Sequence, residues 1–292
     1  MEIPAWPDTR PLLLGDKAYL DRLCAARQPR ISELSFAGLY LFRQAHSYHL
    51  TRIGMADIII GAGYDGSRYA LPPMGADEAQ AREMLLDSGL ALYGIENPLA
   101  KALEERHDLI VSHDRNASDY LYLREELATL PGSRYHKKRN RISYFTARHR
   151  HQTALCQSHH LPGCLKLLRE WEQAAAREEN RSLAWEVEAA AEALEQAEQL
   201  GLQGVVITVD GIVRAFALGE RLNRETAVCH FEKADPFLEG IAQLVNREFA
   251  RLLFSDCIYI NREQDLGEPG LRNAKLSYHP VELVEKYRIR KK

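Results

Sequence analysis

Several features that would place this chain in a membrane or outside the cell are missing from its sequence. No apolar run approaches the ~20 residues that a membrane-spanning helix needs. The first residues, MEIPAWPDTRPLLL, lack a basic segment followed by a long apolar core. A large excess of charge is missing as well: the net charge is −3, which argues against nucleic-acid binding over the whole surface. We therefore expect a soluble cytoplasmic protein without a transmembrane segment.

Cysteine is scarce and scattered, which argues against a disulfide framework. The five cysteines show no C-x-x-C spacing, and such a dispersed, odd set is typical of reduced thiols. One group contains residue types that bind zinc, namely Cys156, His159, His160 and Cys164. Its spacing matches no standard zinc finger, and Pro162-Gly163 indicates an ordinary turn. The sequence therefore favours a histidine-rich surface linker here, and a metal site is the alternative.

The chain does contain enough sequence for two domains. Its 292 residues and 46% hydrophobic content allow a core in each half. Both halves share an order of elements: helices, a meander with an Asp-Gly turn, then alternating helix and strand. The stretch IIIGAGYDGSRYALP in the first half loosely echoes VVITVDGIVRAFALG in the second. We predict two tandem α/β domains, residues 1–150 and 151–292.

The clearest predicted elements lie in the second half. Asp210-Gly211 between alternating apolar runs is a strong hairpin signal. We expect an antiparallel meander of three strands, at residues 204–209, 212–222 and 226–233. An amphipathic helix over 240–254 and a further strand at 258–260 are expected to follow. Two glutamate-rich helices are expected earlier, over 163–179 and 182–200. In the first half, residues 35–52 alternate aromatic and aliphatic side chains and predict one or two strands.

Polar and charged residues follow both strands that flank the predicted helix. They are Glu232, Lys233 and Asp235 after the first strand, and Asn261, Arg262, Glu263 and Asp265 after the second. The carboxyl ends of two parallel strands joined by one helix open on the same edge of a sheet. We therefore expect a ligand site at this edge. His230 lies two residues before Glu232 and could share a proton with a bound nucleophile; a buried core histidine is the alternative.

Two helices contribute further polar residues near this edge. Asn246 lies off the apolar stripe of the 240–254 helix. A later helix begins near Pro269, and Arg272 and Lys275 share one of its faces because they lie three residues apart. This pair is predicted to point at one anionic group, and a solvated helix face is the alternative.

A basic run without any acidic residue extends from Arg134 to His151. Within it we predict phosphate contacts, to a nucleotide or RNA, for Lys137, Lys138, Arg139 and Asn140. Hydrogen-bonding and stacking groups among these charges favour that interpretation. The alternative is a solvated stretch that opposes the glutamates of residues 178–198.

Together these segments resemble the DUF2156 family, which corresponds to the soluble C-terminal domain of phosphatidylglycerol lysyltransferases. The resemblance rests on Glu33-Leu-Ser-Phe-Ala-Gly-Leu-Tyr40, Tyr135-His-Lys-Lys-Arg-Asn140, His230-Phe-Glu-Lys-Ala-Asp235, Asn246-Arg-Glu-Phe249, Asn261-Arg-Glu-Gln-Asp-Leu-Gly267 and Gly270-Leu-Arg-Asn-Ala-Lys275. It implies two tandem acyltransferase domains of the GCN5-related N-acetyltransferase (GNAT) type, similar to the Fem peptidoglycan aminoacyltransferases. Each domain is then expected to be a mixed, mostly antiparallel sheet flanked by helices.

The resemblance also implies an acyltransferase that moves an aminoacyl group from charged tRNA to an amine or hydroxyl without a covalent enzyme intermediate. Charged tRNA is the expected partner and co-substrate, and no further cofactor is expected. The loop at Asp235–Gly240 lacks the Q/R-x-x-G-x-G/A pattern with which coenzyme A-using relatives bind pyrophosphate. Coenzyme A is therefore the less favoured donor. The acceptor stays open among a lipid headgroup, which would need only peripheral membrane contact, a peptide and a small molecule.

For this chemistry we expect catalytic roles, in stabilising developing charge or holding an amino group, for Glu232, Lys233, Arg262 and Lys275. Substrate-binding roles are expected for His230, Asp235, Asn246, Asn261, Glu263, Asp265 and Arg272. RNA phosphates are expected at Lys137, Lys138, Arg139 and Asn140. An acyl-coenzyme A-dependent N-acyltransferase and a non-catalytic RNA- or nucleotide-binding module are the alternatives on the same fold.

Overall fold

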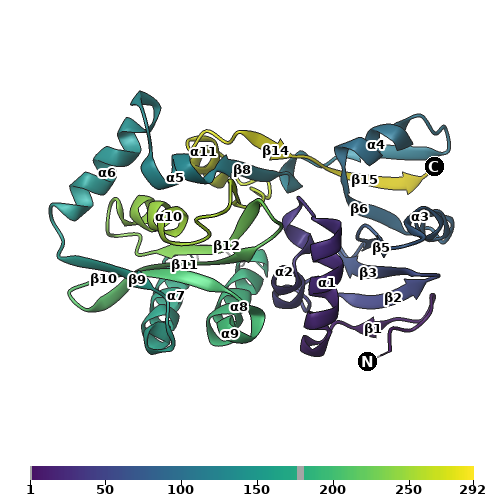
Figure 1. The fold of residues 1–292 in the computed structure, drawn as a ribbon, viewed down its shortest axis with the longest axis horizontal. Helices are drawn as coiled ribbons and strands as arrows, with labels where there is room; N and C mark the ends of the chain where they lie inside the picture. Colours follow the sequence, from purple (N-terminus) through teal and green to yellow (C-terminus); the bar gives the residue numbers. More distant parts are fainter. Residues whose placement is uncertain (1, 176–180) are drawn as a thin grey trace. The chain divides into compact units, whose positions relative to one another are not determined.

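The computed structural model describes residues 2–175 and 181–292, and the chain forms two compact units. The first unit combines the chain up to Tyr120 with Gln264–Arg272 and Leu283–Lys292; the second combines Leu121–Glu263 with Asn273–Glu282. Each unit has its own sheet and helices (Figure 1). Residues 176–180, which include the end of the helix predicted over 163–179, lie outside the described residues.

The sheet of the first unit has the strand order β1-β2-β3-β4-β6-β15-β7, with β5 paired to β3. The strands are Arg10–Pro11 (β1), His49–Ile53 (β2), Ala56–Ala62 (β3), Arg68–Ala70 (β4), Met74–Gly75 (β5), Ala91–Glu96 (β6), Leu109–His113 (β7) and Lys286–Lys291 (β15). Its helices include Lys17–Arg27 (α1), Phe36–Leu41 (α2), Glu78–Asp87 (α3) and Asn97–Glu104 (α4). The apolar residues of α3 and α4 share one core with those of β3 and β6.

The second sheet has the order β14-β8-β13-β12-β11-β10-β9. The strands are Asp119–Leu123 (β8), His151–Leu155 (β9), Gln203–Val209 (β10), Ile212–Arg221 (β11), Thr226–Ala234 (β12), Tyr259–Asn261 (β13) and Glu282–Val284 (β14). The helices include Arg124–Thr129 (α5), His136–Thr146 (α6), Leu161–Ala175 (α7), Arg181–Glu195 (α8), Ala197–Leu200 (α9) and Ile241–Leu252 (α10). Helix α11 (Pro269–Leu276) is divided between the two units after Arg272. In Figure 1, α10 lies on one side of this sheet and α7, α8 and α9 lie on the other.

The predicted meander, amphipathic helix and following strand are confirmed as β10–β12, α10 and β13. The apolar stripe of α10 is buried, including Ile241, Leu244 and Phe249, because its spacing places these side chains on one helix face. Within the described ranges, no helix is both long and apolar enough to cross a membrane.

The strand prediction for residues 35–52 is wrong in its first part. Phe36–Leu41 forms helix α2, and only His49–Ile53 forms a strand. Oγ of Ser35 accepts a hydrogen bond from the backbone N of Gly38 at 3.1 Å. This N-cap satisfies an amide at the start of the helix, and a short apolar run fits either structure by its pattern alone.

The compact units do not divide the chain at one position near residue 150. The C-terminal strand β15 lies in the first sheet between β6 and β7. There Nζ of Lys286 lies 2.6 Å from both a carboxylate oxygen of Asp119 and one of Glu33. Helices α5 and α6, which precede residue 150, pack against α10 in the second unit. Both segments are placed by long-range packing, so the units differ from the division predicted from the order of elements.

Candidate active site

Strands β12 and β13 run parallel at one end and then diverge. Thr226–Val228 pairs with Tyr259–Asn261, after which β12 continues along β11 alone. A β-bulge follows at once, because the partners of adjacent residues in β11 are Cys229 and Phe231, which leaves His230 as the extra residue. A bulge bends its strand and increases its twist. The bulge thus accounts for the divergence.

Three side chains bridge this divergence. Oε2 of Glu232 accepts hydrogen bonds from Nη2 of Arg262 at 3.1 Å and from Nδ2 of Asn246, on α10, at 2.9 Å. The side chain of Arg262 is 14% exposed and Asn246 is 3% exposed. Nη1 of Arg262 and Oδ1 of Asn246 are buried without a hydrogen-bond partner among the described residues. Buried polar atoms are nearly always paired, so this orphaned donor and acceptor indicate a place for a polar ligand.

Lys138 and Tyr278 complete the group. The guanidinium carbon of Arg262 lies 5.0 Å from the ring centroid of Tyr278 and 5.7 Å from that of Tyr122. Nζ of Lys138, on α6, lies 3.9 Å from the same Tyr278 centroid and 2.6 Å from Oγ of Ser277. We use the name β12–β13 site for Lys138, Glu232, Asn246, Arg262 and Tyr278.

The two cations of this site differ in their proton affinity. Burial alone would lower the pKa of Arg262, but the Glu232 carboxylate holds it above its ordinary value. Burial also lowers the pKa of Lys138, and Arg262 and Arg141 add to this effect, so that it falls from 10.5 to about 8 despite the opposing effect of Glu232. The site therefore contains one permanent cation and one amine that titrates just above neutral pH.

His230 has partners of its own beside the site. Nδ1 lies 2.8 Å from Oε1 of Glu263, and Nε2 lies 3.0 Å from Oε1 of Glu220 on β11, with the imidazole fully buried. Burial would lower its pKa, but the two carboxylates raise it to about 10. The imidazolium ties β11, β12 and the loop after β13 together, which corresponds to the buried-histidine alternative.

Replacing His230 by glutamine is expected to destabilise the fold by about 3–5 kcal/mol near pH 6, since it leaves two carboxylates without their cation. The folded pKa, about 10, lies above the ordinary 6.5, so the histidine contributes fully below pH 6.5 and loses its contribution as pH rises to about 10. The difference in unfolding free energy between wild type and His230→Gln should therefore shrink across this range. Urea titrations from pH 6 to 10 measure it, with the exposed His107→Gln as control. A pH-independent difference would contradict the prediction.

Lys275 and Asn261 hold the loop that carries Arg262. Nζ of Lys275 donates to the carbonyl oxygen of Arg262 and, at 3.3 Å, to that of Glu263. Oδ1 of Asn261 accepts from the backbone N of Glu263 at 2.7 Å, and Glu263 has a left-handed φ of 54°. These bonds fix the main chain beside Arg262 and therefore the direction of its side chain.

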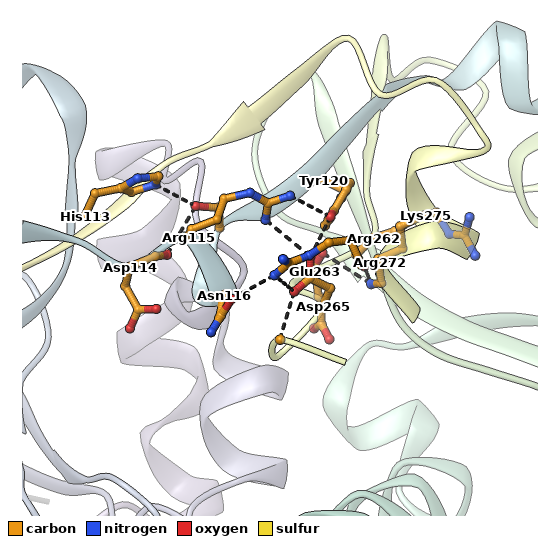
Figure 2. Close-up of polar contacts among 12 residues, drawn as sticks. His113, Asp114, Arg115, Asn116, Tyr120, Arg262, Glu263, Asp265, Arg272 and Lys275 are labelled. Atoms are coloured by element: carbon orange, nitrogen blue, oxygen red, sulfur yellow. Dashed lines mark hydrogen bonds and ion pairs between the residues drawn. The ribbon is translucent and has the colours of Figure 1, made fainter. Parts of the chain in front are cut away.

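Asp265 and Arg272 form a separate cluster within the first unit (Figure 2). Asp265 accepts hydrogen bonds from Tyr120 at 2.5 Å, from Arg115 at 3.2 Å and twice from Arg272 at 2.8 Å. Burial would raise the pKa of Asp265, but the bonds from Arg272 and Tyr120 hold it below its usual range. Arg272 also donates to Asn116 at 2.7 Å. Arg272 and Lys275, predicted to face one anionic group, thus have different partners.

Lys233 and Asp235 also lie apart from the β12–β13 site. Nζ of Lys233 lies 2.5 Å from Oε1 of Glu186 on α8 and 3.5 Å from the ring centroid of Trp171 on α7. Asp235 accepts a hydrogen bond from Arg214 at 3.0 Å. Lys233 therefore faces the α7–α8 side of the sheet, opposite α10 (Figure 1).

The predicted phosphate ligands on α6 point in different directions. Lys137 and Asn140 are exposed. Nη1 of Arg139 donates to the carbonyl oxygens of Leu130 and Gly132 at 2.5 and 2.6 Å. Lys138 belongs to the β12–β13 site. Only Lys137 and Asn140 of the four are thus directed to solvent.

The cysteine- and histidine-containing segment leads from β9 into α7. A hydrogen bond between the two thiols lowers the pKa of Cys156 and raises that of Cys164. His159 and His160 line an open hollow of about 450 Å³ beside Thr208. In the part of the chain that the structure describes, no three His, Cys, Asp or Glu side chains are arranged to hold a metal ion.

Sequence reasoning missed Tyr278, Tyr122 and Ser277, and it assigned Lys138 to RNA phosphates. Ser277 and Tyr278 come two and three residues after Lys275, the last residue of a recognised motif, and this closeness in sequence was the available signal. Tyr122 lies on β8, which neighbours β13 only in the folded sheet. No local pattern marks it.

The first unit contains the same strand–helix–strand arrangement, with β4 and β6 parallel on either side of α3. Apolar side chains lie next to Gly94 of β6 there. A Cβ at Gly94 of β6, which has a φ of 74°, would lie 3.0 Å from Cδ1 of Ile31 and within 4 Å of Leu71 and Pro72. Ile31 and Leu71 are fully buried.

Each of the two units thus contains two parallel strands with a helix between them in sequence, and the chain has a tandem GNAT-like fold. This chain belongs to the family described as phosphatidylglycerol lysyltransferase, C-terminal, whose model matches residues 25–290. A conserved protein of unknown function from Bacteroides thetaiotaomicron VPI-5482 is 32% identical, with a TM-score of 0.89, over 97% of this chain and 99% of its own. No curated protein matches the chain significantly.

Two further structures share the fold. L-PGS from Bacillus licheniformis is 13% identical, with a TM-score of 0.66, over 100% of this chain and 94% of its own. FemX is 9% identical, with a TM-score of 0.57, over 96% of each chain. The predicted family and fold class are thus confirmed, and membership of the family supports a transferase.

Proposed function

We propose that this chain is an aminoacyltransferase that moves an aminoacyl group from charged tRNA to an amine or hydroxyl acceptor. The observation that carries the proposal is the group formed by Glu232, Asn246 and Arg262 where β12 leaves β13. Its carboxylate and the unpaired Oδ1 of Asn246 suit an ammonium group, and the unpaired Nη1 of Arg262 suits a carbonyl oxygen. An α-amino ester presents both groups on adjacent carbon atoms.

Attack on that ester needs no nucleophilic side chain. The acceptor adds to the acyl carbon, a tetrahedral oxyanion forms, and the ribose hydroxyl of the tRNA leaves. Nη1 of Arg262 would stabilise the oxyanion, while Glu232 and Asn246 would hold the ammonium group. Lys275 and Asn261 would act indirectly, by fixing the loop that presents Arg262.

Charged tRNA is favoured over acetyl-coenzyme A as the donor because an acetyl group would leave two polar side chains of the site without a partner. Acetyl-coenzyme A has no ammonium group for Glu232 and Asn246, and a buried polar group without a partner weakens binding. The loop between β12 and α10 carries Asp235 and Glu239, and Phe237 is 86% exposed in it. Acidic residues there disfavour a pyrophosphate. Exposed Lys137 and Arg141 on α6 would suit the phosphates of the RNA.

The family description supplies the first substrates to test, lysyl-tRNA and phosphatidylglycerol. The protein is incubated with [14C]lysyl-tRNA, and then with a mixture of tRNAs charged with labelled amino acids. Either hydroxylamine or phosphatidylglycerol vesicles serve as acceptor. We expect label in the hydroxamate or the lipid at least about 100 times faster than without protein. No acceleration with any charged tRNA would refute the proposal.

Calorimetry with acetyl-coenzyme A tests the alternative donor in parallel. A coenzyme A-dependent enzyme should bind it near the micromolar range, about −8 kcal/mol, whereas we expect no measurable heat. Micromolar binding without aminoacyl transfer would favour an acyl-coenzyme A transferase. Salt-sensitive RNA binding without turnover would favour a non-catalytic module.

A further inference from the structure

Lys138 and Arg262 gather around one aromatic ring. Nζ of Lys138 lies 3.9 Å from the centroid of Tyr278, and the guanidinium carbon of Arg262 lies 5.0 Å from it. The carboxylate beside them, Glu232, is already paired with Arg262. Two neighbouring cations disfavour each other's charged form, and an arginine does not lose its proton in proteins. Lys138 is therefore the group whose charged form the neighbouring arginine disfavours.

The charged groups around Lys138 come from three elements. Arg262 follows β13, Arg141 lies one turn away on α6, and Glu232 lies on β12. Burial and the two arginines lower the pKa of Lys138 to about 8, with Glu232 acting in the other direction. An acid–base group is most effective when its pKa lies near the working pH. Near neutral pH, Lys138 can therefore be present both as an ammonium and as a neutral amine.

The hydrogen-bond partner of Lys138 is compatible with both forms. Oγ of Ser277, 2.6 Å away, accepts a hydrogen bond from Nζ of Lys138 and donates its own proton to the carbonyl oxygen of Ala274 at 2.6 Å. An ammonium and a neutral amine can both be the donor to Ser277. Two buried lysines of the second unit, unlike the half-buried Lys138, have other kinds of partner. Lys233 contacts the Glu186 carboxylate, and Lys275 contacts carbonyl oxygens. The partner of Lys233 is thus a carboxylate, whereas the partner of Lys138 is a neutral hydroxyl.

We propose that Lys138 is the acid–base residue of the transfer, an inference that rests on the proposed function. Its neutral amine takes a proton from the attacking amine or hydroxyl as the new bond to the acyl carbon forms. The ammonium then gives that proton to the ribose oxygen as the ester C–O bond breaks. The products are the acylated acceptor, a free hydroxyl on the tRNA and the neutral lysine. Arg262 keeps its protons throughout.

The protonation state of Lys138 is tested first, without any substrate. Brief acetylation with acetic anhydride from pH 6 to 11, read at each lysine by mass spectrometry, reports how much of each amine is neutral. We expect the inflection for Lys138 near pH 8, against ~10.4 for free Nα-acetyllysine. An inflection for Lys138 above pH 10 would overturn the inference. The result does not depend on whether the protein is active.

The role in transfer is tested by the pH dependence of the reaction with labelled lysyl-tRNA and phosphatidylglycerol vesicles. The wild-type rate should rise through pH 8, and Lys138→Ala should lose at least about 100-fold at pH 7.5 together with that inflection. Lys138→Arg keeps the positive charge and should lose as much, because a guanidinium does not give up its proton. Added methylamine should restore part of the rate to Lys138→Ala. Lys166→Ala, at a lysine on α7 whose side chain is 63% exposed, is the matched control.

The outcomes separate the two proposals. A wild-type protein without transfer overturns the proposed function and this inference together. An active wild type with an equally active Lys138→Arg variant overturns the inference alone. A loss in Lys138→Ala that Lys138→Arg restores identifies a phosphate-binding cation, and it also overturns the acid–base role.

Discussion

Replacing Arg262 by alanine is expected to reduce aminoacyl transfer by about 100- to 1,000-fold, the usual effect of removing one donor to an oxyanion. The reason is the buried Nη1, which has no hydrogen-bond partner within residues 2–175 and 181–292 and is therefore available as a donor to the developing charge. Alanine also leaves Glu232 without its cation, so the unfolding free energy should fall by about 3–5 kcal/mol. Steady-state transfer of labelled lysine and urea titration measure the two effects separately.

Arg262→Lys separates catalysis from stability. A lysine keeps a positive charge beside Glu232, but it lacks the planar arrangement that lets one nitrogen bind the carboxylate while the other faces the substrate. This variant should fold with nearly the wild-type stability and still lose at least about 30-fold in transfer. Arg290→Ala, at an exposed position on β15, is the control. Transfer by Arg262→Lys within threefold of wild type would remove Nη1 from the mechanism.

Replacing Glu232 by glutamine should abolish the preference for a donor with a free ammonium group. The amide keeps the shape and loses the charge, and a hydrogen bond to a charged group contributes about 1.5–3 kcal/mol. We therefore expect kcat/KM for lysyl-tRNA to fall about 10- to 150-fold. Lysyl-tRNA acetylated on its α-amino group should be a poor donor for the wild type and be nearly unaffected by the substitution. The measured quantity is the ratio of the two kcat/KM values.

The same comparison shows whether Glu232 acts on the substrate or on Arg262. If it only holds Arg262, Glu232→Gln will weaken transfer from both donors equally, which would contradict ammonium binding. Asn246→Leu removes the unpaired Oδ1 and should shift the ratio in the same direction by about 5- to 10-fold, as expected for a neutral partner. Glu198→Gln, at an exposed position on α9, is the control.

Much of the second unit follows from local sequence patterns. The Asp210-Gly211 turn and the 3–4 apolar spacing of α10 depend only on neighbouring residues, and β11 and α10 lie where these patterns predict them. The proximity of Glu232 and Arg262 was also predictable, because parallel strands joined by one helix end at the same edge.

The roles of individual side chains were less accessible. Alternation predicts which residues of β12 share a face, but the bulge at His230 changes that register, and the histidine is held by Glu220 and Glu263. The charge of Lys275 suggested an anion, whereas its burial placed it against main-chain carbonyl groups. The presence of a charged residue in a sequence does not show which group it will contact once it is buried.

The sequence by itself determined the family, the tandem fold and the strand edge at which the polar residues gather, because each is encoded in short-range patterns and in motif order. Only the tertiary structure decided which of those residues meet. It brings Lys138 of α6 to the ring of Tyr278, beyond the end of α11, and it leaves one nitrogen of Arg262 buried without a hydrogen-bond partner in the described part of the chain. The physical reason is that burial and long-range packing fix hydrogen-bond partners and proton affinity, and neither is a property of neighbouring residues in the chain.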